Sequence, residues 1–153
     1  MSELRELYQE VILDHYKNPR NQRRPSGTSH DAHGYNPLCG DKLTVYLELD
    51  DSTLKDAGFE GSGCAISVAA ASLMTEAVKG RTRAEVEALF SAYHKLLTGT
   101  GEAGEAGEAA ASLGKLAVLS GVREFPVRVK CATLAWHTLK AALESKAQTV
   151  STE

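Results

Sequence analysis

Four side chains from three distant segments of the sequence constrain the fold of this chain more than any other feature. They are Cys39, Asp41, Cys64 and Cys131. The three thiols are the only cysteines in the chain, and each lies beside glycine or basic residues. Three sulfur ligands and one carboxylate make a four-coordinate set of the kind that zinc accepts. If all four bind one ion, three distant segments of the chain must meet at one place.

The bulk composition limits the class of protein. The 153 residues fit a single domain, expected over 1–153, and the apolar fraction of 42% is ordinary for a soluble globular protein. A net charge of -3 gives no electrostatic case for nucleic-acid binding, and the sequence offers no apolar run of membrane-spanning length. The polar, acidic N-terminus does not resemble a signal peptide, and an odd cysteine count argues against a disulfide framework. We therefore expect a cytoplasmic protein.

The first half of the sequence predicts one helix and a hairpin. Apolar residues recur at helical spacing from Leu4 to His15, and Asn18-Pro19 is expected to end that helix. Residues 21–40 predict a loop with one edge strand at about 28–33. Apolar and polar residues alternate over 43–49, which indicates a half-buried strand, and residues 53–60 predict the returning strand after a turn.

The second half predicts mostly helices. A helix buried on most faces is expected from Cys64 to about Val78, followed by one that Thr82 and Glu85 begin as a capping box. Three Gly-Glu-Ala repeats within 101–109 predict a flexible acidic insertion at about 99–113. A final helix is expected at about 129–145, and a frayed tail at about 147–153.

The predicted helix starts favour thiolate chemistry at two of the cysteines. We expect Cys64 and Cys131 at or just before the first turn of a helix, where free N–H groups stabilise an anion. Three alternatives remain: each cysteine is a small buried apolar residue, the metal is purely structural, or His30 or His33 is an additional ligand. For His15, a structural hydrogen bond is the simpler expectation.

Four motifs, in order, resemble those of the IscU/NifU-like iron–sulfur cluster assembly family. They are Asp14-His15-Tyr16-Lys17-Asn18-Pro19-Arg20-Asn21, Asn36-Pro37-Leu38-Cys39-Gly40-Asp41, Gly61-Ser62-Gly63-Cys64-Ala65-Ile66-Ser67 and Cys131-Ala132-Thr133-Leu134-Ala135-Trp136. Within the family, the chain most resembles the SufU group. Lys130 replaces the histidine that IscU-type scaffolds carry, residues 124–130 differ from their chaperone-recognition segment, and the insertion is similar to that of SufU proteins.

The resemblance implies a fold, a metal site and a partner. The implied fold is α+β and SufE/NifU-like, with a small three-stranded antiparallel sheet, helices packed on one face and an N-terminal helix. The implied ligands of Zn2+ are Cys39, Asp41, Cys64 and Cys131. The implied sulfur donor is a cysteine desulfurase of the SufS type, and a SufBCD-type scaffold is a candidate downstream acceptor.

The predicted function is that of a zinc-dependent sulfurtransferase, which accepts persulfide sulfur from the desulfurase for iron–sulfur cluster assembly. Cys39 is the candidate catalytic nucleophile, because a loop residue moves at lower cost than one anchored on a helix. Arg128 and Lys130 are candidates for steering the donor. The alternative is a scaffold that assembles a [2Fe–2S] cluster, or binds iron, on the same three cysteines. A purely structural zinc module is a third possibility.

Overall fold

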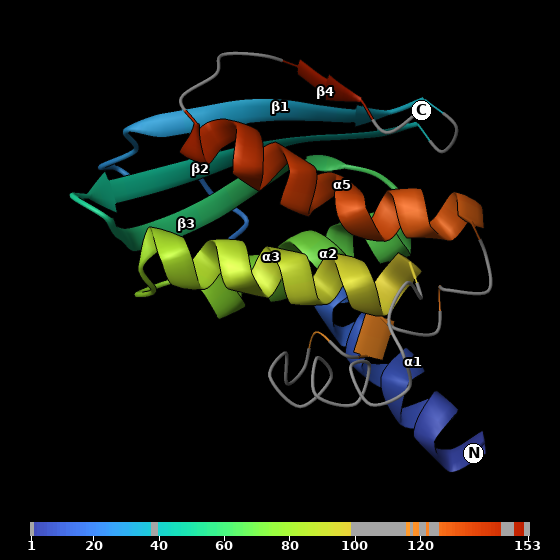
Figure 1. Cartoon of the computed structure of the whole chain (residues 1–153). Helices are drawn as coiled ribbons and strands as arrows, with labels where there is room; N and C mark the ends of the chain where they lie inside the picture. Colours follow the sequence, from blue (N-terminus) through green and yellow to red (C-terminus); the bar gives the residue numbers. More distant parts are fainter. Residues whose placement is uncertain are drawn as a thin grey trace.

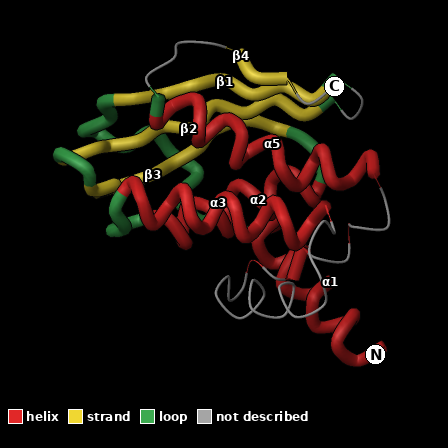
Figure 2. The backbone as a smooth tube through the Cα atoms, viewed as in Figure 1, coloured by secondary structure: helices red, strands yellow, loops and turns green. Residues whose placement is uncertain are grey.

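A sheet and a layer of helices make up the part of the chain that the computed structural model describes (Figures 1 and 2). The described residues are 2–37, 40–98, 116, 118, 119, 122, 126–144 and 149–151, of which residues 2–8, 98 and 149–151 are described by their backbone only. The helices are α1 (Ser2–Lys17), α2 (Ala65–Val78), α3 (Arg83–Thr98) and α5 (Pro126–Leu143). The strands are β1 (His30–Asn36), β2 (Asp41–Asp50), β3 (Thr53–Ser62) and β4 (Thr149–Ser151).

The sheet has the order β3-β2-β1-β4, and its first three strands are antiparallel. This confirms the predicted α+β class and the three antiparallel strands. The short strand β4, which the sequence did not predict, pairs in parallel with β1. This strand, Thr149–Ser151, lies within the tail at about 147–153 that the sequence predicts to be frayed. The other tail residues and the insertion at 99–113 lie outside the described residues, so the predicted domain limits stay predictions.

Strand β1 differs from the predicted edge strand at about 28–33. It runs from His30 to Asn36 and lies between β2 and β4. Its inward residues are Ala32, Gly34 and Asn36, so the strand has no alternation of large apolar residues. The side chains are small because α5 packs closely there, and a Cβ on Gly34 would lie 2.1 Å from Thr138 Oγ1.

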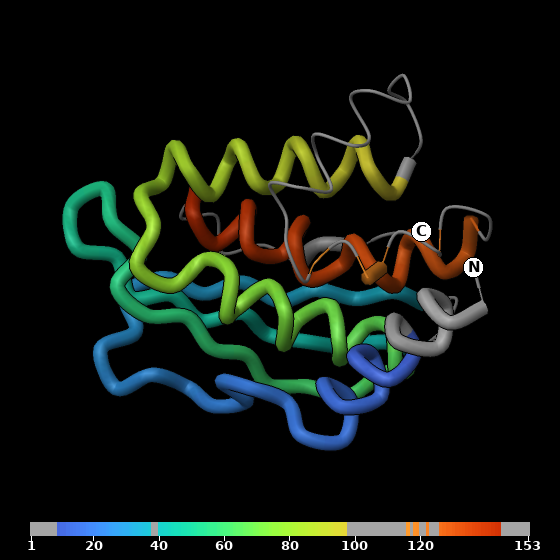
Figure 3. Tube along the Cα trace, turned by 90° about the horizontal axis from the view of Figure 1, so that it is seen from below, coloured from blue at the N-terminus to red at the C-terminus, as the bar shows by residue number. Residues whose placement is uncertain are grey.

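The helices cover one face of the sheet in two tiers. Helix α5 packs on β1 and β2, and α2 packs on β3 beside it, whereas α3 packs against α5 and α1 against α2 (Figure 3). The predicted capping box begins α3: Glu85 accepts the Thr82 N–H (2.9 Å) and Thr82 Oγ1 accepts the Glu85 N–H (3.2 Å). No helix of the described residues is long and apolar enough to cross a bilayer.

Candidate metal centre

Asp41 is the first residue of β2, and its side chain is fully buried. Its Oδ1 accepts a hydrogen bond from the backbone N–H of Cys64 (2.8 Å), which joins the start of β2 to the segment that follows β3. Its Oδ2 lies 3.9 Å from Cys64 Sγ. A carboxylate without exposure to water needs such partners, or a metal ion, to offset its desolvation.

Cys64 is the N-cap residue of α2, as the sequence predicts. Its sulfur accepts a hydrogen bond from the backbone N–H of Ser67 (3.4 Å), one of the N–H groups that a helix leaves free in its first turn. A helix N-terminus also carries partial positive charge, so this sulfur lies where a thiolate is stabilised. The preceding residue is Gly63, at which a Cβ would lie 2.5 Å from Asp41 Oδ1.

Cys131 is placed differently from the prediction. Helix α5 begins at Pro126, a residue that suits the first turn, so Cys131 is its sixth residue and lies beyond the free N–H groups. The prediction that the dipole of a first turn stabilises this thiolate is therefore wrong. The thiol is buried, with Sγ 3.7 Å from the carbonyl of Val127.

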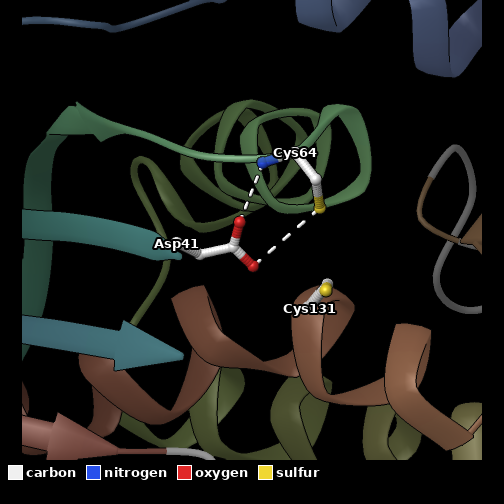
Figure 4. Close-up of side chains that lie close together, drawn as sticks. All are labelled: Asp41, Cys64 and Cys131. Atoms are coloured by element: carbon white, nitrogen blue, oxygen red, sulfur yellow. Dashed lines mark hydrogen bonds between the residues drawn. The ribbon is translucent and has the colours of Figure 1, made fainter. Parts of the chain in front are cut away.

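The three side chains converge although they come from a strand, a helix cap and a helix interior. One ligand atom from each of Asp41, Cys64 and Cys131 lies within 4.8 Å of the others (Figure 4). A tetrahedral zinc with bonds of about 2.0–2.3 Å sets its ligand atoms about 3.3–3.8 Å apart. These donors therefore fit a zinc ion after approaching one another by about 1 Å. Cys39, the fourth predicted ligand, lies outside the described residues.

Asn36 is a residue of this centre that the sequence analysis did not single out. It is fully buried at the end of β1, opposite Asp41 in the hairpin register. Its amide nitrogen lies 3.3 Å from Asp41 Oδ2 and 3.5 Å from Cys131 Sγ. The signal available in the sequence was its position shortly before Cys39, where the end of a strand must lie opposite Asp41 if the two segments form a hairpin.

The candidate histidines lie elsewhere in the described structure. His33 is exposed and its Nδ1 is 2.8 Å from Thr44 Oγ1, whereas His30 pairs with Ser29. Neither belongs to the group formed by Asp41 and the two described cysteines. His15 is buried with Nδ1 2.7 Å from Ser72 Oγ, which confirms the expected structural hydrogen bond.

A family model for the NifU-like N-terminal domain matches residues 7–132, which is most of the chain. The chain belongs to the NifU-like N-terminal domain family. This confirms the family identified from the four sequence motifs.

Individual relatives extend over nearly the whole chain. The zinc-dependent sulfurtransferase SufU of Bacillus subtilis is 39% identical over 137 residues, covering 88% of this chain and 87% of the relative. The iron–sulfur cluster assembly scaffold protein IscU of Streptococcus pyogenes is 36% identical, and the match covers 96% of this chain and 89% of the relative. A crystal structure of a hypothetical protein matches with a TM-score of 0.81 at 36% identity. The match covers 91% of this chain and 98% of that protein. This NifU-like chain therefore has relatives with both names, and its donor set fits a metal ion.

Proposed function

We propose that this NifU-like protein is a zinc-dependent sulfurtransferase that accepts sulfur on Cys39 from the persulfide of a cysteine desulfurase of the SufS type. Zinc would be held by Cys39, Asp41, Cys64 and Cys131. The observation that carries the proposal is the convergence of the last three side chains, within 4.8 Å, in a chain 39% identical to a protein named as a zinc-dependent sulfurtransferase.

The three described residues would form the fixed part of the site. Bound zinc would keep its cysteine ligands ionised at neutral pH without taking part in redox chemistry. Asp41 is held by the Cys64 N–H, and Cys64 is held by the Ser67 N–H, so both ligands are oriented by backbone groups of α2 and its cap. Oriented ligands of this kind support a stable site in which the fourth position, that of Cys39, is the exchangeable one.

Cys39 supplies the chemistry of transfer in this proposal. Its thiolate attacks the outer sulfur of the donor persulfide, the donor S–S bond breaks, and the donor cysteine leaves as a thiolate while Cys39 keeps the transferred sulfur as a persulfide. The step needs no added oxidant or reductant. The next residue, Gly40, is exposed, and a Cβ there would meet nothing within 4 Å, which supports access by a donor from this side.

The decisive experiment is mass spectrometry under non-reducing conditions after the protein is mixed with a desulfurase and L-cysteine. We expect one added sulfur atom on the peptide that contains Cys39, and no such addition in Cys39→Ala. Asp41→Ala is the matched control, because it keeps the nucleophile but removes a zinc ligand. Persistent labelling of the Cys39→Ala variant at an equal rate would refute the proposed role.

A second candidate function is supported by the relatives. The Streptococcus pyogenes protein, named as an IscU scaffold, is 36% identical over 147 residues, and thiolates also bind [2Fe–2S] clusters. Metal analysis of protein purified without added metal separates the two functions. About one zinc per chain supports sulfur transfer, whereas iron with labile sulfide supports a scaffold. Delivery to a SufBCD-type scaffold is the proposed next step for the sulfur.

A further inference from the structure

Asn36 joins two of the proposed zinc ligands that come from different elements. It is the last residue of β1 and none of it is exposed to solvent. Its side-chain nitrogen donates toward Asp41 Oδ2 at 3.3 Å and toward Cys131 Sγ at 3.5 Å. Asp41 begins β2 and Cys131 lies within α5 (Figure 4). The single Asn36 amide therefore connects the sheet side of the centre to its helix side.

The chemistry of an amide suits this position. An Asn NH2 group carries two hydrogens, so the carboxylate and the sulfur can each receive one. Carboxylate and thiolate ligands keep lone pairs that are not used by the metal, and hydrogen bonds to these lone pairs fix the direction of the ligand. An aspartate of the same size at position 36 would present oxygen atoms instead, turning both attractive contacts into contacts between acceptors.

The two described cysteines differ in their places on their helices. Cys64 lies at a helix N-terminus and receives the Ser67 N–H, but Cys131 is the sixth residue of α5 and lies beyond the free amides of that helix. One group of its own helix beside the sulfur is an acceptor, the Val127 carbonyl at 3.7 Å. Asn36 brings a hydrogen-bond donor to this sulfur from another element, β1.

We propose that Asn36 is a positioning residue of the metal centre, one that holds Asp41 and Cys131 in the arrangement that receives the ion. This inference rests on the proposed zinc site. It assigns to Asn36 no contact with the metal or with the transferred sulfur.

The test compares Asn36→Asp and Asn36→Ala with the wild type. Outer-shell partners of metal ligands typically contribute 10- to 100-fold to affinity, so we expect zinc to bind about 10- to 100-fold more weakly in a competition titration with a chromophoric chelator. In the Co2+-substituted variants, the sulfur-to-metal charge-transfer band should move to longer wavelength, because sulfur that loses an N–H donor gives up electrons more readily. A purely structural role would leave that band unchanged.

Asn21→Asp is the matched control. It makes the same change in a residue whose amide donates to Thr75 Oγ1 (3.1 Å), well outside the group of Asp41, Cys64 and Cys131. We expect wild-type zinc affinity and an unchanged band in this variant. A measurement without substitution completes the test: in the wild type, the side-chain amide protons of Asn36 should shift in an NMR spectrum when zinc is added.

The possible failures are distinguishable. If the wild type binds zinc but both Asn36 variants keep its affinity and its band, or if the Asn36 amide protons do not shift, the positioning role is wrong and the proposed function stands. If the wild type binds no zinc, or binds it equally well after Cys64→Ser, the proposed metal site is wrong and the role of Asn36 is wrong with it.

Discussion

Gly63→Ala is the substitution for which the structure predicts the most specific damage to the centre. A Cβ on residue 63 would lie 2.5 Å from Asp41 Oδ1 and 3.0 Å from Asp41 Cγ, whereas ordinary contact begins at 3.4 Å. The carboxylate must therefore retreat by about 0.9 Å, the difference between 3.4 and 2.5 Å. Because the Cys64 nitrogen is two bonds from Gly63 Cα, the retreat also lengthens the 2.8 Å hydrogen bond from that nitrogen to Oδ1.

The free-energy cost follows from these contacts. Asp41 is fully buried, so its displaced side chain cannot simply turn out into solvent. Overpacking of a buried site costs about 1–3 kcal/mol, and weakening a hydrogen bond to a charged group adds about 1 kcal/mol. Restricting the unfolded chain by replacing glycine recovers about 0.4–1 kcal/mol. We expect the free energy of unfolding of the metal-free protein to fall by about 1–3 kcal/mol, and zinc affinity to fall about tenfold or more.

Urea unfolding in the presence of a chelator measures the first quantity, and competition with a chromophoric chelator measures the second. Gly80→Ala is the control, since a Cβ there meets nothing within 4 Å but the backbone φ of 78° is unfavourable for alanine. It should cost about 1 kcal/mol of stability without changing zinc affinity. If Gly63→Ala keeps the wild-type zinc affinity, Asp41 is not a ligand in the observed geometry, and the reasoning fails.

Three further predictions concern stability. Zinc at a thousandfold excess over its Kd should raise the free energy of unfolding by about 4 kcal/mol, so a chelator should lower Tm in a thermal melt and added zinc should restore it. Burial, with His94 and Lys140 nearby, holds the pKa of His137 below its usual range. The folded state thus favours neutral His137, so the free energy of unfolding should fall as pH drops below about 6.5. Urea titrations across pH would measure this fall, which should be less steep in His137→Gln. Thr82→Ala removes the N-cap partner of Glu85 and should lower the free energy of unfolding by about 1 kcal/mol in the same urea assay. An unchanged urea midpoint would contradict the capping role.

Elements specified by neighbouring residues could be predicted from the sequence. The hairpin of β2 and β3, the start of α2 at Cys64 and the capping box of α3 all depend on alternation, helical spacing or capping residues within a few positions. Each of these local signals agrees with the packing that the element finally adopts. The predictions were therefore accurate to within a few residues at their ends.

Features that depend on distant parts of the chain were not predicted correctly. β1 has only small inward residues because α5 packs closely against Gly34, and this contact cannot be seen from the strand itself. β4 exists through its pairing with β1. Helix α5 starts at Pro126, which places Cys131 in the helix interior, where the Asn36 amide lies 3.5 Å from its sulfur. The convergence of Asp41, Cys64 and Cys131 was predictable from residue type, whereas the groups that contact their side chains were not.

The burial of the two described cysteines also bears on which sulfur would accept a persulfide in the proposed function. Cys131 is 1% exposed and therefore out of reach of a donor protein, whereas Cys64 is partly exposed. However, Cys64 caps α2 and its sulfur accepts the Ser67 N–H, so an added sulfur atom there would disturb the helix start. We infer that Cys39 is the remaining acceptor, next to the exposed Gly40. Sulfur found on Cys64 in a protein that keeps its wild-type helix content would refute this inference.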